Sequence, residues 1–173
     1  MQHPDKNKLI ESIKDFSLPK YHEIPNVGLY LEQTAKYITE TLSPLFDNAI
    51  TGSMISNYVK KGLVSNPVKK QYNREQIAYL IFIAVVKNVL SMDDIKLIID
   101  IQKKTYTSED AYGYFETELK NVLSYVFGLK AGLEEADLES SDEKLMLRNI
   151  IITVSHKIYL SKYLLLIEEK SKN

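Results

Sequence analysis

The chain has 173 residues, of which 45% are hydrophobic and 26% charged, and it contains no cysteine. This composition is that of one globular domain or two small ones, and it excludes disulfides, thiolate metal sites and cysteine nucleophiles. The 22 basic and 23 acidic side chains give a formal net charge of -1. Binding to nucleic acid or to a membrane would therefore depend on where the charges lie along the chain.

Two features favour a soluble cytoplasmic protein. Charged residues recur throughout residues 1–16 and leave no room for the apolar core of a secretory signal peptide. The longest uninterrupted apolar run, residues 77–86, has ten residues, about half of the roughly 20 needed to cross a bilayer. We therefore expect neither a signal peptide nor a membrane span.

The first part of the chain is predicted to be irregular, because residues 1–27 contain Pro19 and Pro25. A helix is predicted over residues 28–42, where apolar residues recur at three- and four-residue spacing until Pro44 ends the pattern. A short helix is predicted at 52–61. Its expected N-cap is Thr51, and Gly62 is expected to adopt the left-handed conformation that ends it.

Capping signals mark the helices that follow. Asn73 with Gln76, and Ser140 with Glu143, have the three-residue spacing of capping pairs. The further predicted helices span residues 73–89, 91–104, 108–127 and 140–169. The sequence thus predicts an all-α fold with one small β-wing, organised as an irregular segment at 1–27, a first helical domain at 28–105 and a C-terminal helical region at 106–173.

The residues give no sign of catalysis. The glycines form no phosphate-binding loop, and the three histidines are far apart, none at a metal-ligand spacing from an acidic residue. Adjacent carboxylates such as Asp93-Asp94 and Glu109-Asp110 fall in predicted first turns, where they complement the helix dipole. We therefore predict no catalytic residue, no metal site, no cofactor and no enzymatic activity.

Basic residues are concentrated in the middle of the chain, where residues 50–87 hold six of them against the single acid Glu75. On the helix at 52–61, Ile55 and Tyr58 face inward, and the opposite side carries small polar side chains that can approach base edges. Residues 65–72 have the size of a tight basic hairpin. The candidate DNA-binding residues are Ser53, Ser56, Asn57, Lys60, Lys61, Lys69, Lys70, Tyr72 and Arg74.

At the same residues the sequence resembles the DNA-reading part of the MerR family of bacterial regulators, whose pattern is T-L-R-Y-Y-E-x-x-G-L-L, a basic wing, a tyrosine, then D-L-x-x-L-x-x-I. Residues 54–64 read M-I-S-N-Y-V-K-K-G-L-V, and the likeness extends to L-S-M-D-D-I-K-L-I at 90–98. The resemblance implies a winged helix-turn-helix in which Tyr58 packs and the basic residues contact phosphates. Ser56 and Asn57 stand where the pattern has Arg-Tyr, so the arginine phosphate clamp is missing.

The chain as a whole is more similar to the uncharacterised bacterial family known as domain of unknown function 1836. This likeness includes L-P-K-Y at 18–21 and Y-V-K-K-G-L at 58–63. Because the family has no established activity, the likeness implies a helix-turn-helix regulator by analogy only. One departure from a compact helix-turn-helix is the connection at 43–50, which is longer than the usual turn of three or four residues.

The C-terminal region differs in composition, with ten acidic and four basic residues between 108 and 149. The last predicted helix is apolar over most of its circumference, which favours packing against a second copy. The candidate dimerisation residues are Leu147, Ile151, Val154, Ile158 and Leu165. Tyrosines also cluster in this region, namely Tyr106, Tyr112, Tyr114, Tyr125, Tyr159 and Tyr163. They favour a half-buried helix interface over an effector pocket lined by tyrosines and Phe115 or Phe127, so no specific ligand is predicted.

We therefore expect a cytoplasmic, homodimeric transcriptional regulator that binds double-stranded DNA. The alternative is a protein-interaction or scaffold module that has the winged-helix shape without DNA contacts. The placement of charge discriminates between them. One continuous positive face favours DNA binding, whereas a face covered by Glu32, Glu40 or C-terminal acids favours the interaction module.

Overall fold

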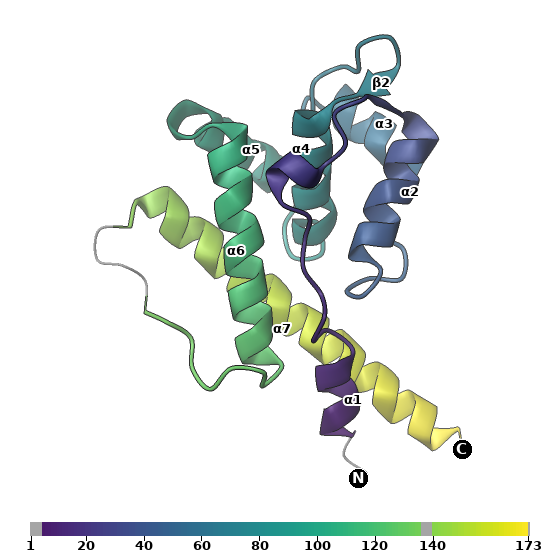
Figure 1. Cartoon of the computed structure of the whole chain (residues 1–173), viewed down its shortest axis with the longest axis vertical. Helices are drawn as coiled ribbons and strands as arrows, with labels where there is room; N and C mark the ends of the chain where they lie inside the picture. Colours follow the sequence, from purple (N-terminus) through teal and green to yellow (C-terminus); the bar gives the residue numbers. More distant parts are fainter. Residues whose placement is uncertain (1–4, 136–139, 173) are drawn as a thin grey trace.

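The computed structural model describes residues 5–135 and 140–172, which are mostly helical (Figure 1). The helices are α1 (Lys6–Glu11), α2 (Leu31–Leu42), α3 (Gly52–Lys60), α4 (Arg74–Val86), α5 (Met92–Thr105), α6 (Ser108–Val126) and α7 (Asp142–Ser171). A 3-10 turn (Tyr21–Glu23) and two short strands, β1 (Leu29–Tyr30) and β2 (Gln71–Tyr72), complete them. The expectation of a predominantly α-helical fold is confirmed.

The predicted helix ends are largely confirmed. Thr51 caps α3 by accepting a hydrogen bond from the Met54 amide, and Gly62 follows with a φ of +75°, which glycine adopts without the strain that a side chain would bring. Asn73 caps α4 together with Gln76. The N-cap of α7 is Ser141 rather than the expected Ser140.

The N-terminal part differs from the prediction in two ways. The segment at 1–27 contains α1 and the 3-10 turn, and its Leu9 and Ile13 are buried. Residues 29 and 30, expected to begin a helix, form β1, which pairs antiparallel with β2 so that Leu29 lies opposite Tyr72. A local periodicity cannot show this pairing, because the partner strand is far away in the sequence.

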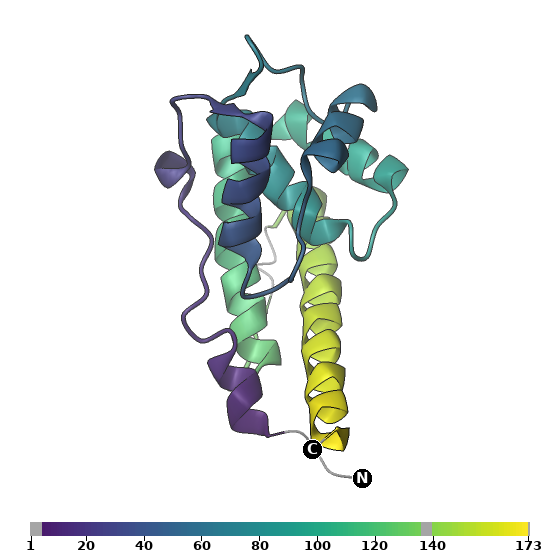
Figure 2. The same ribbon diagram turned by 90° about the vertical axis from the view of Figure 1, so that its right-hand side faces the viewer.

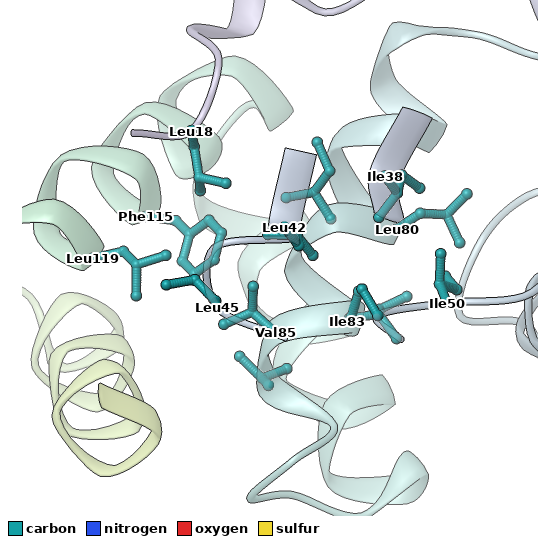
Figure 3. Close-up of a cluster of buried hydrophobic side chains, with 14 of the residues drawn as sticks. Leu18, Ile38, Leu42, Leu45, Ile50, Leu80, Ile83, Val85, Phe115 and Leu119 are labelled. Atoms are coloured by element: carbon teal, nitrogen blue, oxygen red, sulfur yellow. The ribbon is translucent and has the colours of Figure 1, made fainter. Parts of the chain in front are cut away.

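Helix α4 lies at the centre of the fold and is buried on almost every side. It contacts α2 on one side and α6 and α7 on the other. Figure 3 shows side chains from the N-terminal segment (Leu18), α2 (Leu42), α4 (Ile83) and α6 (Phe115) meeting in one apolar cluster. The core therefore runs across the boundary predicted between residues 105 and 108.

Helices α6 and α7 pack along each other, and both lead toward the end of the molecule where α1 lies (Figures 1 and 2). Among the described residues, α7 is the one helix long and apolar enough to cross a membrane. The search for the longest uninterrupted apolar run did not single out this helix, because Lys157 and Lys162 interrupt its apolar residues. Ile151, Val154 and Ile158 are at most 1% exposed, within the core of the same chain.

The burial of α7 corrects the predicted dimerisation surface. Ile151, Val154 and Ile158 leave no surface for a second copy, and Leu147 is half-buried beside a cavity. Only Leu165 of the predicted set is exposed. When apolar residues occupy most of the circumference of a helix, the sequence cannot show which of them will pack against neighbouring helices such as α4 and α6.

Candidate nucleic-acid interface

Helix α3 divides into a packed side and a polar side, as its sequence predicts. Ile55 and Tyr58 are 0% and 3% exposed. The exposed residues are Ser53, Ser56, Asn57, Lys60 and Lys61. Positions three and four apart share one helix face, so the hydroxyl and amide groups form a continuous polar strip that ends in two lysines.

The segment after α3 forms a hairpin with a two-residue turn. The Val68 amide donates to the Gln71 carbonyl at 3.2 Å, and the Gln71 amide donates back to the Val68 carbonyl at 2.9 Å. The two residues between them, Lys69 and Lys70, have φ angles of +51° and +63°. Positive φ at both central residues defines a type I′ turn, so the predicted hairpin is present with both lysines at its exposed tip.

This turn is unusual for the residues that form it. Type I′ turns favour Asn-Gly and Asp-Gly. In the left-handed region the Cβ of most other residues clashes with the backbone, which lowers stability by roughly 1 kcal/mol or more per residue. Lys69 and Lys70 both carry this strain. Such strain is frequent at binding and catalytic sites. Here the strained turn places two cations at the tip of a short loop.

Gln76 holds the base of the hairpin. Its Oε1 accepts from the Asn73 amide at 2.8 Å, which completes the α4 cap. Its Nε2 donates to the Ser65 and Asn66 carbonyls at 3.0 and 3.1 Å and approaches the Ser65 hydroxyl at 3.2 Å. The side chain is 3% exposed. The sequence predicts the cap, whereas the contacts to the hairpin appear only in the fold.

Helix α3 and the hairpin lie at the same end of the molecule, opposite α1 and the C-terminal end of α7 (Figures 1 and 2). Residues 48–74 contain no acidic residue. One acid from elsewhere in the chain, Glu32 of α2, places its carboxylate against Gly52 at the amino end of α3. Glu40 is instead turned toward Lys36 of its own helix, at 3.8 Å.

Two predicted DNA contacts have other roles in the structure. Tyr72 is 4% exposed and belongs to the core, so it cannot contact a phosphate. The Arg74 guanidinium donates to the backbone carbonyls of Ile24 and His22, both at 2.9 Å, and lies 5.9 Å from the centre of the Tyr21 ring. Arg74 therefore fastens the N-terminal segment to α4, a role that no local pattern indicates.

The remaining predicted contacts can act together chemically. Hydroxyl and amide groups on α3 can donate to and accept from base edges, and the lysines of α3 and of the hairpin can attract phosphates. No group of three or more potential metal-ligating side chains occurs in residues 5–135 and 140–172.

Comparison with known proteins identifies one matching family model, but no individual protein whose role has been assigned. No curated protein and no solved structure matches the chain. The family model described as "Domain of unknown function (DUF1836)" matches residues 19–125. The match begins after α1 and ends within α6, so it includes α3, the hairpin and α4. Since it covers more than half of the sequence, the chain belongs to the DUF1836 family.

Proposed function

We propose that this protein is a transcriptional regulator that binds double-stranded DNA with α3 and the hairpin at residues 65–72. The observation that carries the proposal is the type I′ turn with Lys69 and Lys70 at its tip. Folding alone would favour Asn-Gly there. Two strained, exposed lysines beside an acid-free polar helix are suited to a polyanion.

The dimensions of α3 agree with this role. An α-helix with its side chains is about 10–12 Å across and the major groove is about 12 Å wide, so the nine residues of α3 can lie in the groove. With α3 in the groove, Asn57 and the serines would face base edges. The hairpin would then meet the neighbouring phosphates as the wing of a MerR-like winged helix, in which phosphate contacts set the position and base contacts the sequence preference.

Fluorescence anisotropy at several salt concentrations tests the proposal, with duplexes from the protein's own upstream DNA and a random duplex. We expect salt-sensitive binding and a preference for the upstream DNA, since each phosphate contact contributes about 0.9 to the salt slope. Absence of binding at low salt by the folded protein would contradict the proposal. That result would favour the protein-interaction module, for which Glu32 at the amino end of α3 already provides an acidic contact.

Asn57 is expected to determine sequence preference rather than overall affinity. Replacing Asn57 by Ala removes an amide that can form two hydrogen bonds with the major-groove edge of adenine, at N6 and N7, which contributes about 1–3 kcal/mol of discrimination. The expected result is a smaller affinity difference between the preferred and the random duplex, measured by competition, with little change on random DNA. An equal loss on both duplexes would make Asn57 a backbone contact.

The same proposal includes a homodimer joined through the distal part of α7. Leu160, Leu164 and Leu165 are 54%, 57% and 50% exposed. Lys157 and Glu168 lie almost in line with Leu164 along the helix, at about 100° per residue. If two copies pair antiparallel around a two-fold axis between residues 162 and 163, Lys157 of one copy lies opposite Glu168 of the other.

Replacing Leu164 by Asp should separate this dimer. The carboxylate would be buried between two apolar helices, which weakens association by roughly 100-fold or more. Sedimentation of the wild type should show a dimer at concentrations where the variant is a monomer. Leu97→Asp on α5, at a leucine that is 60% exposed, is the control and should leave the dimer intact. A wild-type monomer at high concentration would contradict the pairing.

A further inference from the structure

A cavity of about 420 Å³ lies between α4, α5, α6 and the first turns of α7. Most of its wall is apolar, including Phe82, Ile99, Phe115 and Leu147. Phe82 and Phe115 meet edge to face, with ring centres 5.2 Å apart. Small-molecule sites have volumes of about 300–1,000 Å³, whereas packed protein interiors leave few voids larger than a water molecule.

The polar part of the wall is held in place by hydrogen bonds. The Tyr79 hydroxyl donates to Gln102 Oε1 at 2.9 Å, and Gln102 Nε2 donates to the Tyr106 carbonyl at 2.8 Å. The Tyr106 hydroxyl lies 2.7 Å from the Ser141 hydroxyl. These bonds join α4, α5 and the start of α7, so the aromatic wall is already ordered before anything binds.

Among the described residues that line the cavity, Lys144 is the one cation. Its ammonium lies 6.0 and 5.7 Å from the centres of the Tyr106 and Tyr114 rings. No carboxylate forms an ion pair with Lys144 in the described part of the chain. The two acids that line the cavity have other partners, since Glu143 accepts from Thr105 and Asp110 accepts from Thr107.

We infer that this cavity binds a small organic anion with an aromatic or branched apolar body, whose acidic group pairs with Lys144. The apolar body would cover Phe82 and Leu147, which are half-buried and otherwise lack contacts on the side of the cavity. Of the residues that the sequence associated with an effector pocket, Phe115, Tyr106, Tyr112 and Tyr114 line the cavity. Phe127 does not, and its ring packs 5.3 Å from that of Tyr159.

Two fluorescent probes with the same skeleton test the inference. Anilinonaphthalene sulfonate carries an anionic group, and N-phenylnaphthylamine lacks it. We expect saturable binding of both to the folded protein. Lys144→Gln should weaken the sulfonate about tenfold, the effect of removing one charge-assisted hydrogen bond, and leave the neutral probe within about twofold. Lys120→Gln, at an exposed lysine of α6 that does not line the cavity, should change neither.

A second pair of variants identifies the site of binding. Ala111→Trp fills the cavity from α6, and Ala131→Trp places the same side chain on an exposed loop. The first should abolish binding of both probes and the second should not. Leu147→Trp replaces Ala111→Trp if cooperative unfolding shows that the latter does not fold.

Three results would overturn the inference. They are no saturable binding by the wild type, equal binding by the filled and control variants, and an equal loss of both probes in Lys144→Gln. No measurement involves DNA, so the outcome is independent of the proposed function.

Discussion

Replacing Lys69 by Asn and Lys70 by Gly should make the protein more stable and a weaker binder of DNA. Asn-Gly is the preferred pair for a type I′ turn, so the variant removes the strain of two left-handed lysines and should raise the free energy of unfolding by about 1 kcal/mol. It also removes two cations from the hairpin tip. For each phosphate that loses its lysine, duplex affinity should fall about tenfold and the salt slope by about 0.9.

Denaturant unfolding and anisotropy on the same samples measure the two effects. The control is Lys6→Gln with Lys8→Gln, which removes the same charge from α1 at the opposite end of the molecule (Figure 1). It should leave DNA affinity almost unchanged. If the control weakens binding as much as the turn variant, the effect is one of total charge and the hairpin does not touch the DNA. A fall in stability in the turn variant would contradict the strain argument.

Gln76→Met should destabilise the protein by about 2–3 kcal/mol. Methionine has nearly the volume of glutamine but no amide. The Asn73 amide therefore loses its acceptor, and the Ser65 and Asn66 carbonyls lose their donor. Each such hydrogen bond contributes about 1 kcal/mol. The hairpin should also lose its fixed base, so DNA affinity should fall even though no charge changes.

Gln33→Met is the matched control for Gln76→Met. Gln33 Oε1 accepts from the Tyr30 amide at 2.9 Å, which is the same capping bond at the start of α2. Gln33 is exposed and no hairpin depends on it, so its loss should cost about 1 kcal/mol or less. Equal destabilisation by the two variants would show that the hydrogen bonds from Gln76 to the hairpin contribute nothing.

The candidate interface shows which features a local sequence pattern can predict and which it cannot. The inward stripe of α3, its N-cap and the lysine pair at a hairpin tip follow from residue order within a few positions. Tyr72 and Arg74 carry the same kind of local signal, yet one is buried in the core and the other bonds to the backbone of the N-terminal segment. Their surroundings come from residues far away in the sequence.

The sequence by itself determined the helices, their caps and the position of the basic segment, because helical periodicity, capping and turn chemistry act over a few residues. Only the tertiary structure decided that β1 pairs with β2, that Ile151, Val154 and Ile158 of α7 lie in the core, and that Tyr79, Tyr106 and Tyr114 line a cavity with Lys144. Those outcomes depend on which surfaces meet when distant segments pack, and the sequence pattern leaves that choice open.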